Sequence, residues 1–220
     1  MTIKRMILGG LFAALFAGGA QAHPHVWVTI ETEIEHDGEG RIVAMRNRWT
    51  FDEMFSSYAI LGLDTNKDGK YDREELAELA KVNVTSLKEF EFFTFIREGE
   101  GYAPLRDATD YWLDYVDSRL VLNFTLPLAR PHDGRKAETV FAIYDPTNFV
   151  SFAYGGEGSI RLGAHAPKAC KLKVPASPPQ PMSMNLAAAR EAQMAPENAD
   201  PTASLPPADE RDVVIDCKMS

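Results

Sequence analysis

Residues 26–36 read VWVTIETEIEH, an alternation of apolar and polar side chains that decides how the chain begins to fold. Successive side chains of a β-strand point to opposite faces, so this period predicts a strand with one buried face. The turn signal DGEG follows at 37–40, and RIVAMRNRWTF at 41–51 returns to a strand pattern. We therefore expect a β-hairpin over residues 26–51.

Two helical patterns follow the hairpin. Thr50 and Glu53 fit a capping box, and the apolar residues after them repeat with the period of a helix. A first helix is therefore expected over about 52–63. The spacing of apolar residues between 76 and 90 predicts a second helix.

Strand patterns return after the second helix, separated by clusters of Gly, Pro and Asp. Short strands at this spacing are typical of a sandwich or an open antiparallel sheet. We therefore expect one α+β domain over 23–173, mainly an antiparallel β sandwich or open sheet, with an EF-hand-like helix-loop-helix inserted at about 52–95. The expected strands cover 92–97, 110–117, 119–127, 138–144, 149–154 and 159–165.

The N-terminal segment 1–22 has the features of a secretory signal peptide. A basic start precedes an apolar run too short to span a bilayer, and Ala20-Gln21-Ala22 has the small-residue pattern of a cleavage site. Cleavage after Ala22 predicts export to a bacterial periplasm without a later membrane span, and an uncleaved anchor is the alternative. The formal net charge of −9 argues against nucleic acid or an anionic membrane surface as a partner.

The C-terminal part of the chain changes in composition. Residues 174–210 are rich in Pro and Ala, which predicts a flexible segment, and DVVIDC within 211–220 resembles one last strand. In an oxidising compartment the even pair Cys170 and Cys217 most simply forms a disulfide, which would tie this strand back to the sheet. A metal–thiolate site is the alternative, although no C-x-x-C spacing is present.

The segment 64–75 contains the motif with the most specific spacing. It matches the EF-hand calcium loop, with Gly69 at the position of the sharp turn. Oxygen ligands in this number suit Ca²⁺ better than zinc or copper. A solvated acidic turn and a dockerin are the alternatives, but dockerins repeat the loop, and a single copy favours a structural clip over a sensor. The expected calcium ligands are Asp64, Asn66, Asp68, the Lys70 carbonyl, Asp72 and Glu75.

His23 and His25 flank Pro24 directly after the expected cleavage site. A mature N-terminus at His23 could chelate a metal through its α-amine and imidazole, and both imidazoles would lie on one face of an extended segment. The square-planar chelate through the amide of residue two is excluded, because Pro24 has no N–H. Exposed polar residues leading into a strand are the alternative. Candidate third ligands are His165 above all, then His132, Asp145 and Glu157.

Catalytic signatures give no support for an enzyme. The sequence has no nucleophile elbow, no H-E-x-x-H, no P-loop and no G-x-G-x-x-G between a strand and a helix.

Several motifs together resemble one exported bacterial family, known as domain of unknown function 1007. They are HPHVWV at 23–28, WTFDEMF at 49–55, the loop at 64–75, FFTF at 92–95 and YDPTNF at 144–149, and the resemblance covers roughly residues 23–170. Members are commonly described as periplasmic components of an ABC-type transport system, some of them linked to nickel, cobalt or zinc transporters. The resemblance therefore implies metal delivery or sensing beside a transition-metal permease of the inner membrane.

Three hypotheses follow. The first is a periplasmic accessory protein of a nickel, cobalt or zinc transport system, with His23 and His25 as ligands and a structural calcium site. The second is a copper-handling or copper-redox protein that uses an N-terminal histidine brace. The third is an interaction module in which calcium orders a docking surface.

Overall fold

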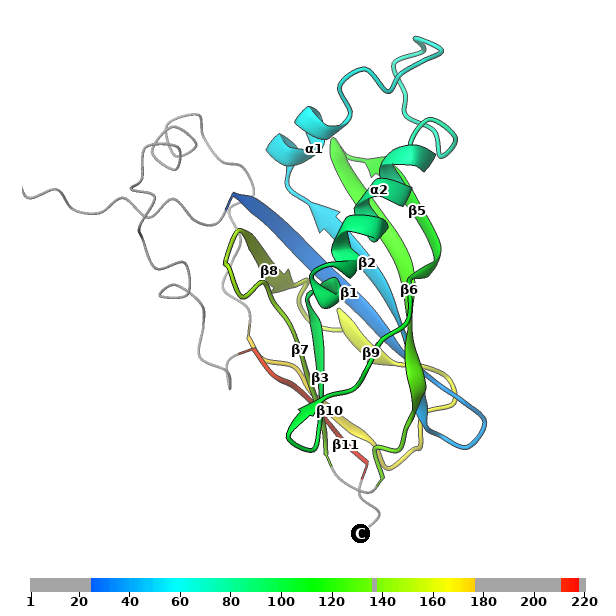
Figure 1. Cartoon of the computed structure of the whole chain (residues 1–220), viewed down its shortest axis with the longest axis vertical. Helices are drawn as coiled ribbons and strands as arrows, with labels where there is room; N and C mark the ends of the chain where they lie inside the picture. The colour runs from blue at the N-terminus through cyan, green and yellow to red at the C-terminus, as the bar shows by residue number, and fades with distance from the viewer. Residues whose placement is uncertain (1–24, 136–137, 177–210, 218–220) are drawn as a thin grey trace, which may run out of the picture.

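The computed structural model describes residues 25–135, 138–176 and 211–217, which form two β-sheets and two α-helices (Figure 1). The expected signal peptide, His23 and residues 177–210 of the Pro/Ala-rich segment lie outside the described residues. Among the residues that are described, no helix is long and apolar enough to cross a membrane.

Six strands make the first sheet: β1 (Val26–His36), β2 (Ile42–Phe51), β5 (Thr109–Val116), β6 (Arg119–His132), β8 (Val150–Tyr154) and β9 (Ile160–Leu162). Their order is β5-β6-β2-β1-β8, and β9 pairs with β1 beyond the end of β8. Five strands make the second sheet: β3 (Thr94–Glu98), β4 (Gly101–Tyr102), β7 (Thr139–Ile143), β10 (Lys171–Lys173) and β11 (Val213–Asp216). Their order is β10-β11-β7-β3-β4.

The predicted hairpin is present as β1 and β2, which pair antiparallel, and every second residue of β1 is buried. Asp37 shapes the turn, since its Oδ1 accepts the N–H groups of Glu39 at 3.0 Å and Arg41 at 2.9 Å. Gly40 has φ +78°, and a Cβ there would lie 2.8 Å from Pro167 Cγ. Both the backbone conformation and the packing therefore require glycine at position 40.

The direction of two strands was not expected from the sequence. β8 and β9 both run parallel to β1, whereas the other pairings within the two sheets are antiparallel. Strand spacing alone does not reveal this, because a parallel partner needs a crossover from elsewhere in the chain. The sheets are mainly antiparallel, in agreement with the expected α+β class, whereas the EF-hand-like helix-loop-helix stays a prediction.

The helical segment comprises α1 (Glu53–Ala59), α2 (Ala77–Lys88) and the 3₁₀ turn η1 (Glu91–Phe93). The expected capping box is wrong, because position 50 belongs to β2 and Asp52 caps α1 by accepting the Phe55 N–H at 2.9 Å. Asp52 also accepts the Trp27 N–H at 3.0 Å, which ties the start of α1 to β1. The first helix ends at Ala59, before the expected residue 63, and Gly62 adopts φ +82° in the following turn.

One apolar core joins the two sheets and α2. Trp49 of β2, Phe124 of β6 and Phe141 of β7 are its largest fully buried side chains. The helix α2 contributes Ala80 and Val84, one turn apart on the same face. The upper part of the first sheet is therefore covered by helix, and the second sheet covers its lower part (Figure 1).

The predicted last strand is present as β11, which lies between β7 and β10. The disulfide joins Cys170 to Cys217 across 47 residues of sequence. The Tyr154 hydroxyl donates to the Arg211 carbonyl at 2.9 Å, just before β11 begins. The C-terminal strand is thus held at both ends.

The burial of His36 predicts how the stability of the fold depends on pH. Its ring is buried, its Nδ1 lies 2.9 Å from the Ile34 carbonyl, and its Nε2 has no partner among the described residues. Burial lowers the pKa of His36, against smaller opposing effects of the Ile34 carbonyl and Asp37. His36 therefore binds a proton more readily in the unfolded chain than in the folded chain. For this reason the free energy of unfolding should fall as the pH drops below about 6.5.

A His36→Leu variant is expected to lose this component of the acid destabilisation. Thermal melts at pH 7.5, 6.0 and 5.0 should show a wild-type midpoint that falls more steeply than that of the variant. His132→Leu is the control, because that ring is less buried and bonds the Thr139 hydroxyl at 3.0 Å. Parallel pH profiles for wild type and His36→Leu would contradict the assignment.

Candidate functional site

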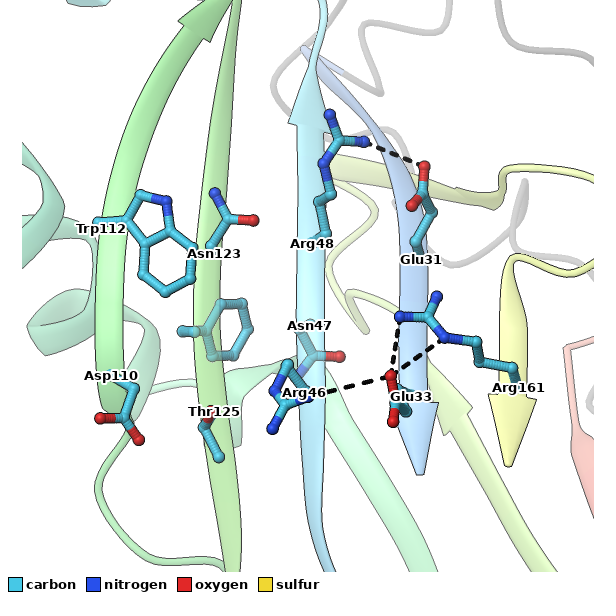
Figure 2. Close-up of a pocket in the computed structure, with 11 residues that line it drawn as sticks. Glu31, Glu33, Arg46, Asn47, Arg48, Asp110, Trp112, Asn123, Thr125 and Arg161 are labelled. Atoms are coloured by element: carbon cyan, nitrogen blue, oxygen red, sulfur yellow. Dashed lines mark hydrogen bonds and ion pairs between the residues drawn. The ribbon is translucent and has the colours of Figure 1, made fainter. Parts of the chain in front are cut away.

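The outward face of the first sheet contains a polar pocket of about 330 Å³ (Figure 2). Its walls come from β1, β2, β5, β6 and β9, so one sheet face supplies nearly every group. The lining residues are Glu31, Glu33, Arg46, Asn47, Arg48, Asp110, Trp112, Asn123, Phe124, Thr125 and Arg161.

Acidic and basic side chains face each other across three neighbouring strands of this pocket. The register puts Glu31 opposite Arg48, with an ion pair of 3.0 Å, and Glu33 opposite both Arg46 and Arg161. Arg161 and Glu33 form an ion pair of 2.8 Å. Figure 2 marks this contact with dashed lines. Exposed pairs of this kind contribute only about 0–1 kcal/mol each to stability. These five side chains form a charged array on the outward face of the sheet.

Asp114 on β5 links this pocket to the loop at 64–75. Its Oδ2 accepts the Trp112 Nε1–H at 2.9 Å and the Asn123 amide at 3.1 Å, and its Oδ1 accepts the Arg73 Nε–H at 2.7 Å. The Arg73 guanidinium also lies over the Trp112 ring, 4.8 Å from its centroid. The rings of Tyr71 and Tyr115 meet edge to face at 5.0 Å. The predicted calcium loop is therefore docked on β5 through two adjacent aromatic contacts.

Within the loop, the side chains at the expected ligand positions turn inward. Asp64 accepts the N–H groups of Asp68 and Gly69, both at 3.1 Å. Asn66 accepts the Asp68 N–H at 2.9 Å, and Asp68 accepts the Lys70 N–H at 2.8 Å. These oxygens therefore gather around the loop's own backbone, with Gly69 at φ +78° at the sharp turn.

The far end of the loop folds back on its beginning through Glu75. Its Oε1 accepts the Thr65 N–H at 2.8 Å, the Thr65 hydroxyl at 2.9 Å and the Asn66 N–H at 3.2 Å. Asp72 accepts the Glu75 N–H at 3.0 Å. Desolvation raises the pKa of Glu75, but these hydrogen bonds and one from the Asp72 N–H outweigh it and lower the pKa overall. Glu75 is thus held ionised within reach of the loop's first residues.

The loop has the oxygen donors that calcium needs, but these oxygens are not gathered around one metal position. Among the described residues, no group of three or more His, Cys, Asp or Glu side chains is placed to hold a metal ion. The carboxylates instead accept amide hydrogen bonds, and none of the four has an ion-pair partner in the part of the chain that the structure describes. Calcium binding would therefore require these oxygens to exchange amide hydrogen bonds for the ion.

His25 and His165 are not brought together, and His23 lies outside the described residues. His25 precedes β1, donates its N–H to the Phe149 carbonyl at 2.8 Å and lies with its ring 4.9 Å from that of Phe149. His165 follows β9, whose Leu162 pairs with Ile34 near the opposite end of β1. The intervening length of β1 is roughly 30 Å at the usual rise of a strand, so His25 and His165 do not share a site. His132 lies at the end of β6, next to Thr139, and Asp145 bonds its own loop.

Sequence reasoning missed the charged array and the Asp114 link. A signal for the array was present, since Glu31, Glu33 and Glu35 alternate on one strand of the hairpin and Arg46 and Arg48 on the other. Pairing the strands across the turn would have placed opposite charges together. The Arg73–Asp114 contact spans 41 residues and left no local signal.

These features define an α+β protein with a polar pocket on the outward face of one sheet and a carboxylate-rich loop docked beside it. The sequence matches the family described as "Protein of unknown function (DUF1007)" over residues 8–215, and the chain belongs to this family. It is also similar to an uncharacterized 15.5 kDa protein in the trpE 3′ region of Spirochaeta aurantia. The two are 29% identical over 103 residues, which cover 47% of this chain and 73% of the relative.

Proposed function

We propose that this protein is a periplasmic, divalent-metal-binding accessory protein of a transition-metal transport system. Calcium at 64–75 would fasten the helical segment to the sheet as an EF-hand-like clip. His23 and His25 would bind nickel, cobalt or zinc for an inner-membrane transporter. The inward-turned oxygens of the 64–75 loop are the observation that carries the metal-binding part of this proposal.

The donor set of the loop fits calcium in number and kind. Asp64, Asn66, Asp68, Asp72 and Glu75 supply side-chain oxygens, and Lys70 offers a carbonyl, at the spacing that an EF-hand loop uses. Four of these residues carry negative charge with no basic partner among the described residues, so a bound cation would relieve their repulsion. When bound, calcium would supply charge neutralisation and a fixed loop geometry. Arg73 and Tyr71, within the loop, would transmit that geometry to β5.

His25 supports the transition-metal part. The Phe149 carbonyl and ring fix its backbone and side chain at the start of β1, and the expected mature N-terminus lies two residues earlier. The link to transport, the periplasmic location and the choice among nickel, cobalt and zinc come from the family resemblance. His165 is not included as a ligand because of its distance along β1.

Calorimetric titration with Ni²⁺, Co²⁺ and Zn²⁺ tests the histidine pair in protein that begins at His23. The His23→Ala/His25→Ala double variant should bind the preferred ion more than about tenfold more weakly, since even outer-shell changes cost that much. Wild-type affinity should also fall below about pH 6, where protons compete for the imidazoles. His165→Ala is the matched control and should bind normally. Equal affinity of the double variant and wild type would remove the histidines from the proposal.

A second candidate function is favoured by the contact of Arg73 with Asp114 and Trp112. In this alternative, calcium orders a docking surface on the outward face of the first sheet. The charged array would then recognise a polar protein partner, and no transition metal would be involved. The loop and the face are joined through the Asp114 carboxylate and through Arg73 over the Trp112 ring, so calcium could alter the pocket wall at Trp112.

A further inference from the structure

A second cavity, of about 400 Å³, lies on the inner side of the first sheet, between α2, η1, β8 and the loop before β8. It is distinct from the polar pocket, because its walls come from the opposite face of β1 and β2. Six of the thirteen lining residues are aromatic: Trp49, Phe51, Phe90, Phe93, Phe149 and Phe152. The volume falls within the range of small-molecule sites, roughly 300–1,000 Å³.

Two buried hydrogen-bond donors in this lining lack an acceptor among the described residues: Trp49 Nε1 and Asn83 Nδ2. Trp49 is only 1% exposed, and its ring packs edge-on against Phe124 and Phe152 at 5.0 Å each. An indole N–H can only donate. Buried donors are nearly always paired in folded proteins. An acceptor oxygen on a molecule that occupies the cavity is therefore a suitable partner for two donors whose side chains line it.

Asp145 restricts the charge of that acceptor. It is 2% exposed, and its carboxylate accepts the Thr147 N–H and hydroxyl, both at 2.8 Å, and the Val150 N–H at 3.0 Å. These donors are neutral, and Asp145 has no ion-pair partner among the described residues. The lining therefore carries a net negative charge that repels a carboxylate or phosphate entering the cavity.

The mouth of the cavity is apolar. Phe90 is 50% exposed and Phe149 is 48% exposed, although both side chains line the cavity. A ligand that covers these two rings would remove apolar surface from water while its polar atom reaches the buried donors. The ring of His25 lies against Phe149 at this mouth.

We propose that this cavity binds an uncharged small organic molecule with an aromatic or branched apolar body and one carbonyl or hydroxyl oxygen. The oxygen accepts hydrogen bonds from Trp49 and Asn83, the body packs among the phenylalanines, and Asp145 excludes anions. The inference is independent of metal binding at 23–25 or at 64–75.

Three naphthalene probes of similar size test this site: 1-acetylnaphthalene with a carbonyl acceptor, 1-ethylnaphthalene without one, and anionic 1-naphthoate. Binding is followed by nitrogen–proton NMR, since the chain has 3 tryptophans and hence three indole N–H resonances. Trp49→Phe identifies the resonance of Trp49. The acetyl probe should shift that resonance and bind about fivefold to tenfold more tightly than the ethyl probe, as expected for a hydrogen bond. Naphthoate should bind most weakly at pH 7.

Variants separate the cavity from adventitious surface binding. Asn83→Leu should keep affinity for the ethyl probe while reducing the preference for the acetyl probe. Ser86→Trp fills the cavity from α2 and should weaken all binding, whereas Val82→Trp, at an exposed position of the same helix outside the lining, should not. The proposal is overturned if the Trp49 resonance does not move at saturation, if the acetyl and ethyl probes bind equally, or if both tryptophan insertions act alike.

Discussion

Replacing Glu75 with Gln is expected to weaken calcium binding about a hundredfold, because the last loop position supplies the bidentate carboxylate of an EF-hand. Exported modules bind calcium with dissociation constants of about 10⁻⁴ to 10⁻³ M. At the tighter limit, 10 mM Ca²⁺ is about a hundred times the dissociation constant and stabilises the fold by about 2.7 kcal/mol. For a domain of this size, that raises the wild-type melting temperature by about 5–10 °C.

The matched control is Glu74→Gln, which removes the same charge from the adjacent, exposed position. Glu75→Gln should lose nearly all of the calcium-dependent rise in melting temperature, whereas Glu74→Gln should retain most of it. Calorimetric titration gives the affinities directly, and Mg²⁺ at the same concentration tests selectivity. If 10 mM Ca²⁺ leaves the melting temperature of the wild type unchanged, the calcium clip is ruled out at the tighter limit of affinity.

The same titration distinguishes a clip from a calcium-ordered docking surface. The Trp112 indole donates to Asp114, which also receives Arg73 from within the loop. If calcium acts on the outward face, the Trp112 indole resonance should shift on binding in wild type and shift much less in Arg73→Gln. A resonance that stays in place while the melting temperature rises would indicate a local clip and would count against the docking surface.

The parts of the fold that could be predicted from the sequence are those coded by neighbouring residues. The alternation at 26–36 and the DGEG turn gave the hairpin, since register and burial there follow from residues a few positions apart. The parallel pairing of Val26 with Val150 joins residues that are more than 100 positions apart in the sequence, so no local pattern predicts it. For the same reason, a strand at 160–162 could be predicted from the sequence, but its pairing with β1 could not.

The candidate sites show the same difference between features coded by neighbouring residues and features that depend on distant ones. The loop at 64–75 was found because its ligands are contiguous, and its inward-turned oxygens agree with that spacing. Asp114 and Asn83 were missed as site residues, and Asp145 was named only as a candidate metal ligand, because each acquires its role from residues that are distant in sequence or from burial. His165 illustrates the opposite error. Its residue type suggested a metal ligand, but β9 carries it to the far end of β1 from His25.

Removing the disulfide is the second change with a large expected effect. The bond between Cys170 and Cys217 closes a loop of 47 residues, and the chain-entropy relation gives about 4 kcal/mol for a loop of that length. In a domain of this size, the Cys170→Ala/Cys217→Ala variant should therefore melt about 8–16 °C lower than wild type. Thermal unfolding with and without a reducing agent measures the effect, and reduced wild type should approach the variant.

The size of the loss should depend on whether β11 stays docked. Val213 and Ile215 are fully buried between the sheets, but the strand has only four residues and pairs with β7 and the three-residue β10. Hydrogen exchange at 213–216 separates the two cases. If the variant loses stability through the entropy of the unfolded chain alone, these amides should exchange only with global unfolding. If β11 detaches on its own, they should exchange faster than the amides of β1. In that case the disulfide also keeps the edge of β7 covered in the native state.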